Sequence, residues 1–200
     1  MHSDLFGRTP PPVPGLRYFD GVISAQEEHD LIARIEEIDL PHFPFRQWVS
    51  NRRTRSFGWL YDFQSSNFAP ADPIPEFLLP LKSRAAHFTG VPVDRIVQVS
   101  LIKYEPGAGI GWHKDRIELD AVIGISLGSP ATMRFRRRTE AGFDRASVLL
   151  SPRSMYHLDG EVRSEWEHSI APGDQTRWSI TFRGLSEEGR RLSGLKRTES

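Results

Sequence analysis

The sequence contains no cysteine. That absence excludes disulfide frameworks, thiolate zinc sites, iron–sulfur clusters and cysteine nucleophiles. No apolar run approaches the roughly 18 residues that a membrane span needs. The first 15 residues lack both the basic and the apolar segment of a secretory signal. We therefore expect, by default, a cytoplasmic protein without membrane contact.

An excess of charge of one sign is also lacking, because 26 basic residues balance 26 acidic ones. Proteins that bind long stretches of nucleic acid through the phosphates usually carry a basic excess. Any contact with nucleic acid is therefore expected to be local.

The length suits a single domain that buries a full core without a metal or disulfide. We expect a flexible Pro-rich arm over residues 1–15, the domain over residues 16–185 and a polar tail over residues 186–200. We also expect a monomer.

Two helices are predicted in the first half of the chain. Ser24 and Glu27 have the spacing of a capping box, and the helical pattern that follows ends at Pro41. A second helix is predicted over residues 74–89, with Gly90 as its C-terminal stop. The apolar stripe of this second helix consists of Leu78, Leu81, Ala85 and Phe88.

Strand patterns dominate the rest of the chain. Phe57, Trp59, Tyr61 and Phe63 alternate with other residues, which predicts a strand with one aromatic face. Further strands are predicted over residues 96–104, 121–127, 131–137, 146–150, 154–158 and 177–183. Short strands after two helices indicate an α+β fold whose antiparallel double sheet has helices on one side.

His113 and Asp115 are two residues apart, and residues i and i+2 of an extended segment project to the same side. A distant histidine, His168, can complete a facial triad that leaves coordination sites on Fe(II) open. A 2-oxoacid and dioxygen would take those sites. The pattern therefore predicts a mononuclear iron site.

A second His-x-Asp motif, His157-Leu158-Asp159, competes with the first, because the motif alone is weak. His157 precedes His168 by only eleven residues, which leaves little chain for a return through another strand. His113 precedes His168 by 55 residues and follows a turn-rich segment. We therefore prefer His113 and Asp115, and interpret His157 as structural.

Residues 177–183 alternate without exception between polar and apolar side chains, which predicts a strand. Its polar face carries Arg177, Ser179, Thr181 and Arg183. An arginine fork can bind a carboxylate with two hydrogen bonds, as the free end of a dicarboxylate would require. A strand with a solvated basic face is the alternative interpretation.

The sequence resembles the AlkB family of Fe(II)/2-oxoglutarate dioxygenases between about residues 53 and 184. The matching segments are Arg53-Thr54, Phe57-Gly58, Tyr61, Ile74-Pro75-Glu76-Phe77-Leu78, Tyr104-Glu105-Pro106-Gly107, Ile110-Gly111-Trp112-His113-Lys114-Asp115, Ser126-Leu127-Gly128, His168-Ser169-Ile170 and Arg177-Trp178-Ser179-Ile180-Thr181-Phe182-Arg183. The triad and the closing Arg-x-Ser-x-Thr-x-Arg segment carry most of the specificity.

The resemblance implies a double-stranded β-helix (jelly-roll) core that uses Fe(II), 2-oxoglutarate and dioxygen. It implies iron ligands at His113, Asp115 and His168. It also implies 2-oxoglutarate contacts from Tyr104, Arg177 and Arg183, and we add Ser179 as a hydroxyl between the two arginines. The implied reaction is hydroxylation of an N-methyl group, which releases formaldehyde, as in DNA repair.

Two positions depart from the family pattern. Ile102 stands two residues before Tyr104, where family members often have an asparagine that contacts the cofactor. Ile117 stands two residues after Asp115, where the DNA-repair members carry an acidic residue near the base. A carboxylate would attract a cationic methylated base, so Ile117 bears on the identity of the substrate.

For a nucleobase in single-stranded DNA or RNA, the predicted contacts are Trp48, Trp59 and Tyr61 for stacking and Arg53 for a phosphate. These aromatics could equally face the core, with the arginines around residue 53 on a solvated edge. A second basic run comprises Arg134, Arg136, Arg137 and Arg138, where alternation predicts a strand with an exposed basic face.

Two other functions stay open. The same oxidation could act on a methylated protein side chain, a lipid or a small molecule, which the balanced charge and Ile117 favour. The chain could also be a non-catalytic jelly-roll binding module, although such a module would not require the triad and both arginines.

Overall fold

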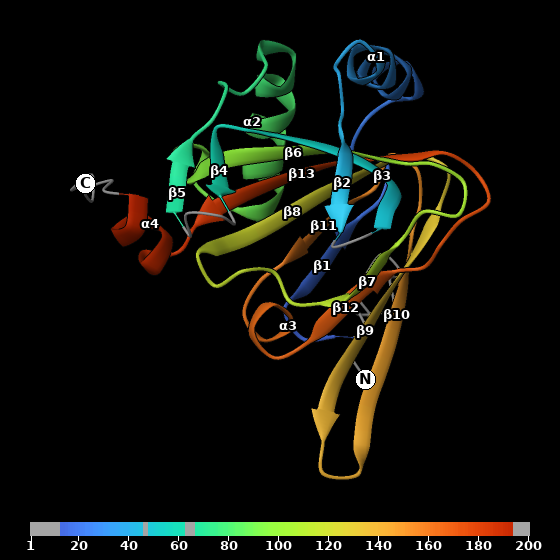
Figure 1. Cartoon of the computed structure of the whole chain (residues 1–200), viewed down its shortest axis with the longest axis vertical. Helices are drawn as coiled ribbons and strands as arrows, with labels where there is room; N and C mark the ends of the chain where they lie inside the picture. Colours follow the sequence, from blue (N-terminus) through green and yellow to red (C-terminus); the bar gives the residue numbers. More distant parts are fainter. Residues whose placement is uncertain (1–12, 46–47, 63–66, 194–200) are drawn as a thin grey trace, which may run out of the picture.

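The computed structural model describes residues 13–45, 48–62 and 67–193, and within them two antiparallel sheets face each other (Figure 1). The large sheet has the strand order β1 (Leu16–Phe19), β11 (Met155–Leu158), β8 (Leu119–Gly128), β13 (Arg177–Leu185), β6 (Ile96–Tyr104), β3 (Trp48–Phe57) and β2 (His42–Phe45). The small sheet has the order β10 (Gly142–Leu150), β9 (Ala131–Thr139), β12 (Glu167–Ile170) and β7 (Ile110–His113). This arrangement is the predicted double-stranded β-helix.

Two helices cover the face of the large sheet that points away from the small sheet (Figure 1). Helix α1 (Ala25–Glu36) begins at the predicted capping box, with Ser24 Oγ accepting from the Glu27 amide at 3.1 Å. Helix α2 (Leu79–Thr89) follows a 3₁₀ turn, η1 (Glu76–Leu78), and ends at Gly90 with φ at 71°. The predicted placement of helices on one sheet is confirmed.

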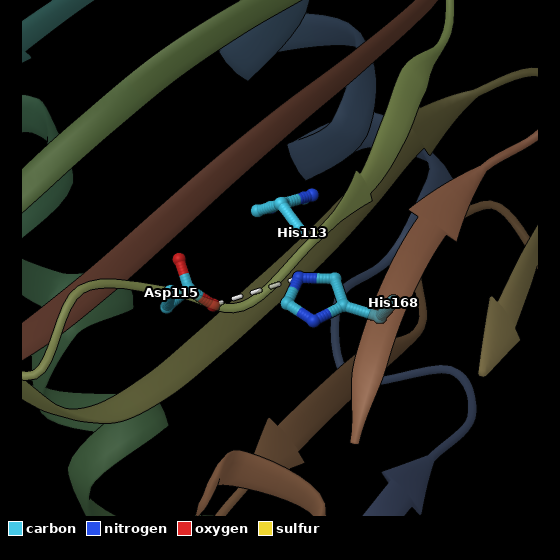
Figure 2. Close-up of side chains that lie close together, drawn as sticks. All are labelled: His113, Asp115 and His168. Carbon is cyan, nitrogen blue, oxygen red and sulfur yellow. Dashed lines mark ion pairs between the residues drawn. The ribbon is translucent and has the colours of Figure 1, made fainter. Parts of the chain in front are cut away.

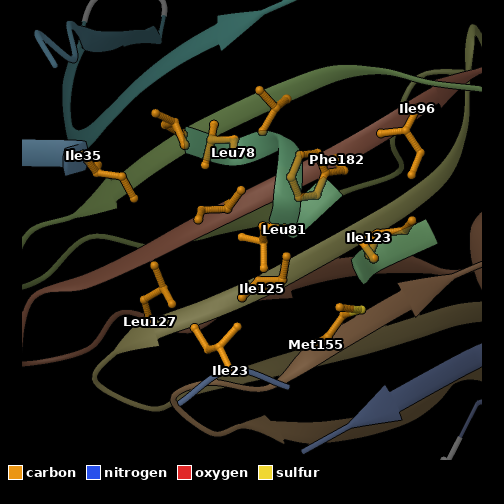
Figure 3. Close-up of a cluster of buried hydrophobic side chains, with 14 of the residues drawn as sticks. Ile23, Ile35, Leu78, Leu81, Ile96, Ile123, Ile125, Leu127, Met155 and Phe182 are labelled. Carbon is orange, nitrogen blue, oxygen red and sulfur yellow. The ribbon is translucent and has the colours of Figure 1, made fainter. Parts of the chain in front are cut away.

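The core between these helices and the large sheet is continuous (Figure 3). Ile35, Leu78 and Leu81 from the helical side pack in one cluster with Ile125 and Phe182 from the strands. Complete burial of each such side chain contributes roughly 1.5–3 kcal/mol to the free energy of folding. Phe88 does not join the predicted buried stripe, because it is 39% exposed and its ring packs on that of Phe19, at 5.4 Å between centroids, and near His87.

Strand β13 carries its apolar residues, Ile180 and Phe182 among them, toward the helices. Alternation therefore directs its odd-numbered residues to the other face, toward the small sheet. A second cluster fills part of the space between the sheets and includes Val122, Met133, Phe135, Tyr156, Leu158 and Trp166. The predicted strand over 177–183 is confirmed, and its polar face lies inside the protein.

The single aromatic strand expected over residues 57–63 is two strands. Gly58 has φ at 84°, and a Cβ there would lie 2.0 Å from the Val97 carbonyl oxygen, so the chain turns at this glycine. β3 joins the large sheet, whereas β4 (Trp59–Asp62) pairs with β5 (Asn67–Pro70) in a separate ribbon. Phe63 lies outside the described residues.

The remaining elements are short: η2 (Val93–Arg95), α3 (Glu161–Ser164) and α4 (Glu187–Ser193). The arm expected over residues 1–15 lies mostly outside the described residues, but Val13 packs between the sheets at 1% exposure. Helix α4 occupies part of the expected C-terminal tail. Among the described helices, none has the length and apolar character to cross a membrane.

Candidate metal centre

Two neighbouring strands of the small sheet bring distant histidines together (Figure 2). His113 ends β7, and His168 is its direct cross-strand partner on β12, so both rings project from the same face. Their ring centroids are 4.3 Å apart. Asp115 follows in the loop after β7, and one potential ligand atom from each residue lies within 4.8 Å of the others. The structure thus assembles the predicted triad.

Both histidines turn a ring nitrogen toward this cluster. The Nδ1 atom of His113 lies 2.9 Å from the carbonyl oxygen of Gly111, which can only accept, so Nδ1 donates there and Nε2 is the ring atom left to bind a metal. His168 is 8% exposed, and burial lowers its pKa to about 4. Its imidazole is therefore neutral near pH 7, as a metal ligand must be.

The Asp115 carboxylate is buried and charged. Burial alone would raise the pKa of Asp115, but Arg183 and the two histidines lower it more, and its net shift is downward. Oδ1 lies 3.7 Å from Arg183 Nη2, and Oδ2 lies 3.5 Å from His168 Nε2. Oδ2 accepts no hydrogen bond from the described residues. A buried acceptor beside two imidazole nitrogens fits a divalent cation.

Arg163 of α3 holds the loop that carries Asp115. Its guanidinium donates to the carbonyl oxygens of Asp115 at 2.9 Å, Leu119 at 2.7 Å and Asp120 at 3.3 Å, and also to that of Arg116. One side chain thereby fixes the backbone on both sides of the loop. No residue pattern predicts this role, because contacts with backbone carbonyls do not depend on the side chains of the residues contacted.

Arg177 lies on the inner face of β13 and is 3% exposed. Its Nε donates to Ser126 Oγ at 3.1 Å, and its guanidinium carbon lies 4.9 Å from the ring centroid of Tyr104, its cross-strand neighbour. Nη1 has no hydrogen-bond partner, and the guanidinium has no carboxylate partner, within the described ranges. A buried cation without a counterion is costly, so this corner suits an anionic ligand.

Arg183 lies at the metal end of the same face. It contacts Asp115, as described above, and its Nη1 donates to Ser100 Oγ at 2.9 Å. Between the two arginines, Ser179 is 2% exposed and its hydroxyl lies 3.4 Å from that of Thr181. The face therefore offers a cation at each end and hydroxyls between them, which excludes the solvated-strand interpretation.

Tyr156 is an inner-face residue that sequence reasoning missed. Burial, and then the neighbouring Tyr104, raise the pKa of Tyr156 to about 12. Asp115 also raises this pKa, whereas Arg177 and Arg183 lower it. The Tyr156 ring packs over Gly124, where a Cβ would lie 2.1 Å from the ring. A glycine in an otherwise apolar strand was the available signal.

The predicted substrate residues are not brought together by the described contacts. Arg53 pairs with Glu105, at 2.9 Å between Nε and Oε1. Trp59 packs against the small cluster of Leu119 and Leu185. The side chains of Trp48 and Tyr61 lie outside the described part of the structure. The roles of these four residues stay predictions.

The competing motif has a different environment. His157 is 1% exposed and its Nδ1 accepts from Arg17 Nη2 at 2.7 Å, while Asp159 is exposed and accepts from the Gly160 amide. Neither belongs to a cluster of three potential metal ligands among the described residues.

Comparison with known proteins agrees with this geometry. A model of the family described as the 2OG-Fe(II) oxygenase superfamily matches residues 15–193. The mouse protein "tRNA (carboxymethyluridine(34)-5-O)-methyltransferase ALKBH8" is 29% identical over 86% of this chain, which spans only 26% of that protein. An Arabidopsis thaliana protein, "Alkylated DNA repair protein ALKBH8 homolog", is 24% identical over 79% of the chain and 51% of its own length.

The solved structure of OsALKBH1 superposes with a TM-score of 0.63 at 14% identity, over 86% of this chain and 97% of that one. At such low identity the likeness concerns the fold alone. The family match, by contrast, covers nearly the whole described chain and carries its cofactors, Fe(II) and 2-oxoglutarate. This protein belongs to the 2OG-Fe(II) oxygenase superfamily and is an AlkB-like dioxygenase.

Proposed function

We propose that this dioxygenase removes N-methyl groups from nucleobases in DNA or RNA. The observation that carries the proposal is the partly buried triad facing two inward-pointing arginines. The names of the mouse and Arabidopsis relatives, which refer to tRNA and to alkylated DNA, support nucleic acid as the substrate class.

The proposed reaction balances without a further reductant. The substrate N–CH₃, dioxygen and 2-oxoglutarate give N–CH₂OH, succinate and carbon dioxide, with one oxygen atom in the hydroxyl and one in succinate. The hemiaminal then loses formaldehyde and leaves N–H on the base. Each turnover therefore yields one succinate and one formaldehyde.

Each inner-face residue has a role in this proposal. His113, Asp115 and His168 would hold Fe(II), which when bound supplies the activation of dioxygen. Arg177, with Tyr104 beside it, would bind the carboxylate of 2-oxoglutarate far from the metal. Arg183 keeps the Asp115 carboxylate charged and oriented, because its guanidinium is the leading cause of the lowered pKa.

The test is an assay for succinate and formaldehyde with Fe(II), ascorbate and 2-oxoglutarate. The substrates are single-stranded DNA and RNA that carry 1-methyladenine or 3-methylcytosine, and Asp115→Ala is the control. Equal amounts of both products, with loss of the methyl mass from the oligonucleotide, are expected. Succinate without formaldehyde from any of these substrates would contradict the proposal.

A second candidate, the same oxidation of a methylated protein or small molecule, has one structural observation in its favour. Ile117 in the Asp115 loop is 76% exposed and carries no charge. The adjacent Glu118 accepts two hydrogen bonds from Arg116, at 2.9 and 3.2 Å, and is 9% exposed. Neither side chain offers a free carboxylate to a cationic base.

A further inference from the structure

The outer face of the small sheet carries a concentration of arginines. Met133 and Phe135 of β9 point into the core between the sheets. Alternation therefore places Arg134, Arg136 and Arg138 on the outer face. The register pairs Arg136 with Arg145 and Arg138 with Phe143 across the β9–β10 hairpin. We call the surface formed by Arg134, Arg136, Arg138, Phe143, Arg145 and Trp112 the basic face.

Ion pairing distinguishes this face from its surroundings. Arg137, on the opposite side of β9, has three carboxylate partners: Asp144, Glu161 and Glu165. On the basic face, only Arg136 has a carboxylate partner in the described structure, Glu167 at 2.6 Å. Four arginines against one glutamate leave three uncompensated positive charges, in a chain whose formal net charge is zero. The basic excess that the whole sequence lacks is present locally.

Aromatic rings lie among these guanidinium groups. The Arg136 guanidinium carbon lies 4.5 Å from the Trp112 ring centroid and 5.0 Å from that of Phe143. Arg134 stacks on Trp112 at 5.3 Å, and Arg145 on Phe143 at 5.5 Å. Phe143 is nevertheless 37% exposed. Flat cations and open rings on one surface offer both phosphate contacts and stacking positions for bases.

The basic face connects to the metal centre through β7. Trp112 and His113 are consecutive on this edge strand, so the one projects outward while the other projects toward the metal ligands. Three strand spacings, about 14 Å, separate β10 from β7. The β9–β10 hairpin also projects beyond the body of the protein, since β12 pairs with β9 only as far as Arg136 (Figure 1).

From this arrangement we infer that the basic face binds single-stranded nucleic acid, with arginines on phosphates and Phe143 stacked on a base. The inference rests on the proposed nucleic-acid substrate and adds the surface that docks it. An aromatic ring among guanidinium groups can stack on a base, which favours nucleic acid over an acidic protein segment as the partner. On the outer side of the β9–β10 hairpin, the exposed large apolar side chains among the described residues are Phe143 and Leu149. So few apolar side chains disfavour insertion into a membrane.

The test measures fluorescence anisotropy of labelled single-stranded RNA and DNA of one sequence as a function of salt. Arg138→Ala/Arg145→Ala removes two contacts, so the salt slope should fall by about 1.4 and the affinity about 25-fold near 0.1 M salt. Phe143→Ala should weaken binding between about 5-fold and 150-fold with the slope unchanged.

The matched control, Arg95→Ala/Arg191→Ala, removes the same charge from exposed positions on η2 and α4, and should leave the slope unchanged. Thermal unfolding of every variant verifies the fold. The inference is overturned if both double variants lose affinity equally, or if the wild-type protein binds neither RNA nor DNA. It is also overturned if polyglutamate or anionic vesicles bind with the same dependence on Arg138 and Arg145.

Product analysis separates this inference from the proposed reaction. Binding through the basic face, with no formaldehyde from any methylated oligonucleotide, would support the docking surface and reject the demethylation. Formaldehyde formation with the same kcat/KM in both double variants would support the demethylation and reject the docking surface.

Discussion

Two His-x-Asp motifs in this chain share a pattern but occupy different environments. His113 and His157 both lie on strands, one in the small sheet and one in the large sheet. The cross-strand partner of His113 is another ligand, His168 on β12. The cross-strand partner of His157 is Arg17 on β1, which donates a hydrogen bond to it. The chemistry of the cross-strand partner therefore separates a metal centre from a structural histidine.

The aspartates differ even more. β7 ends at His113, so Asp115 is placed by its loop, which Arg163 holds, rather than by strand alternation. Its side chain is 9% exposed, while Asp159 is exposed to solvent. A short motif thus needs a loop that turns its carboxylate inward before it can bind a metal.

The largest expected effect follows directly from this difference. His113→Ala, Asp115→Ala or His168→Ala should abolish turnover, because each removes one of three metal ligands. Asp159→Ala should retain it and change the free energy of unfolding by no more than about 0.5 kcal/mol. Succinate release measures turnover, Mn(II) titration measures metal binding, and urea unfolding measures the free energy of unfolding. Turnover that survives in Asp115→Ala would exclude this metal centre.

Arg177→Gln should weaken 2-oxoglutarate binding more than metal binding. Loss of a buried charged hydrogen bond costs about 1.5–3 kcal/mol, or roughly 10- to 150-fold in Kd. Arg177→Lys is the matched variant, which keeps the charge but loses the fork and should recover part of the affinity. Titrations of 2-oxoglutarate and of Mn(II) separate the two sites, and equal losses in both would count against the assignment.

Arg163→Ala should lower the affinity for Mn(II) by about 10- to 100-fold, since it frees the loop that carries Asp115. Arg137→Ala is the control, because it removes ion pairs to Glu161 on the same helix and to Glu165 just after it, but no contact with the loop. Unfolding of the metal-free proteins tests the alternative. A loss of stability with unchanged metal affinity would assign Arg163 a structural role only.

Sequence reasoning succeeded where one strand carries a clear period. The strand over residues 96–104 has the predicted bounds, and the alternation over 177–183 correctly placed both arginines on one face. It did not predict β7 and β12, whose four residues each show no clear alternation between polar and apolar side chains. The aromatic alternation continues through Gly58 although the chain turns there, because side-chain spacing does not record φ.

The candidate site shows the same division. Chain distance and the turn-rich segment before His113 together favoured His113 over His157, and the structure clusters His113, not His157, with His168. Arg163 and Ser126 could not be predicted, since one acts through backbone carbonyls and the other through a single hydroxyl on a neighbouring strand. Such contacts depend on three-dimensional register, which a single sequence does not display.

The smallest expected effect concerns the stability that His157 contributes. Burial, and then the nearby Arg17, lower its pKa to about 4, although Asp159 opposes the shift. An unfolded chain with a histidine pKa near 6.5 binds the proton first, so stability is lost as the pH falls. Between about pH 7 and 5.5 this should amount to about 1 kcal/mol.

Urea unfolding of the metal-free protein at several pH values measures this contribution. His157→Gln keeps an acceptor for Arg17 but cannot titrate, so its stability should fall less steeply with acid than that of the wild type. His29→Gln, at an exposed position on α1, controls for the loss of a histidine elsewhere. If His157→Gln shows the same pH dependence as the wild type, protonation of His157 does not account for the loss of stability in acid.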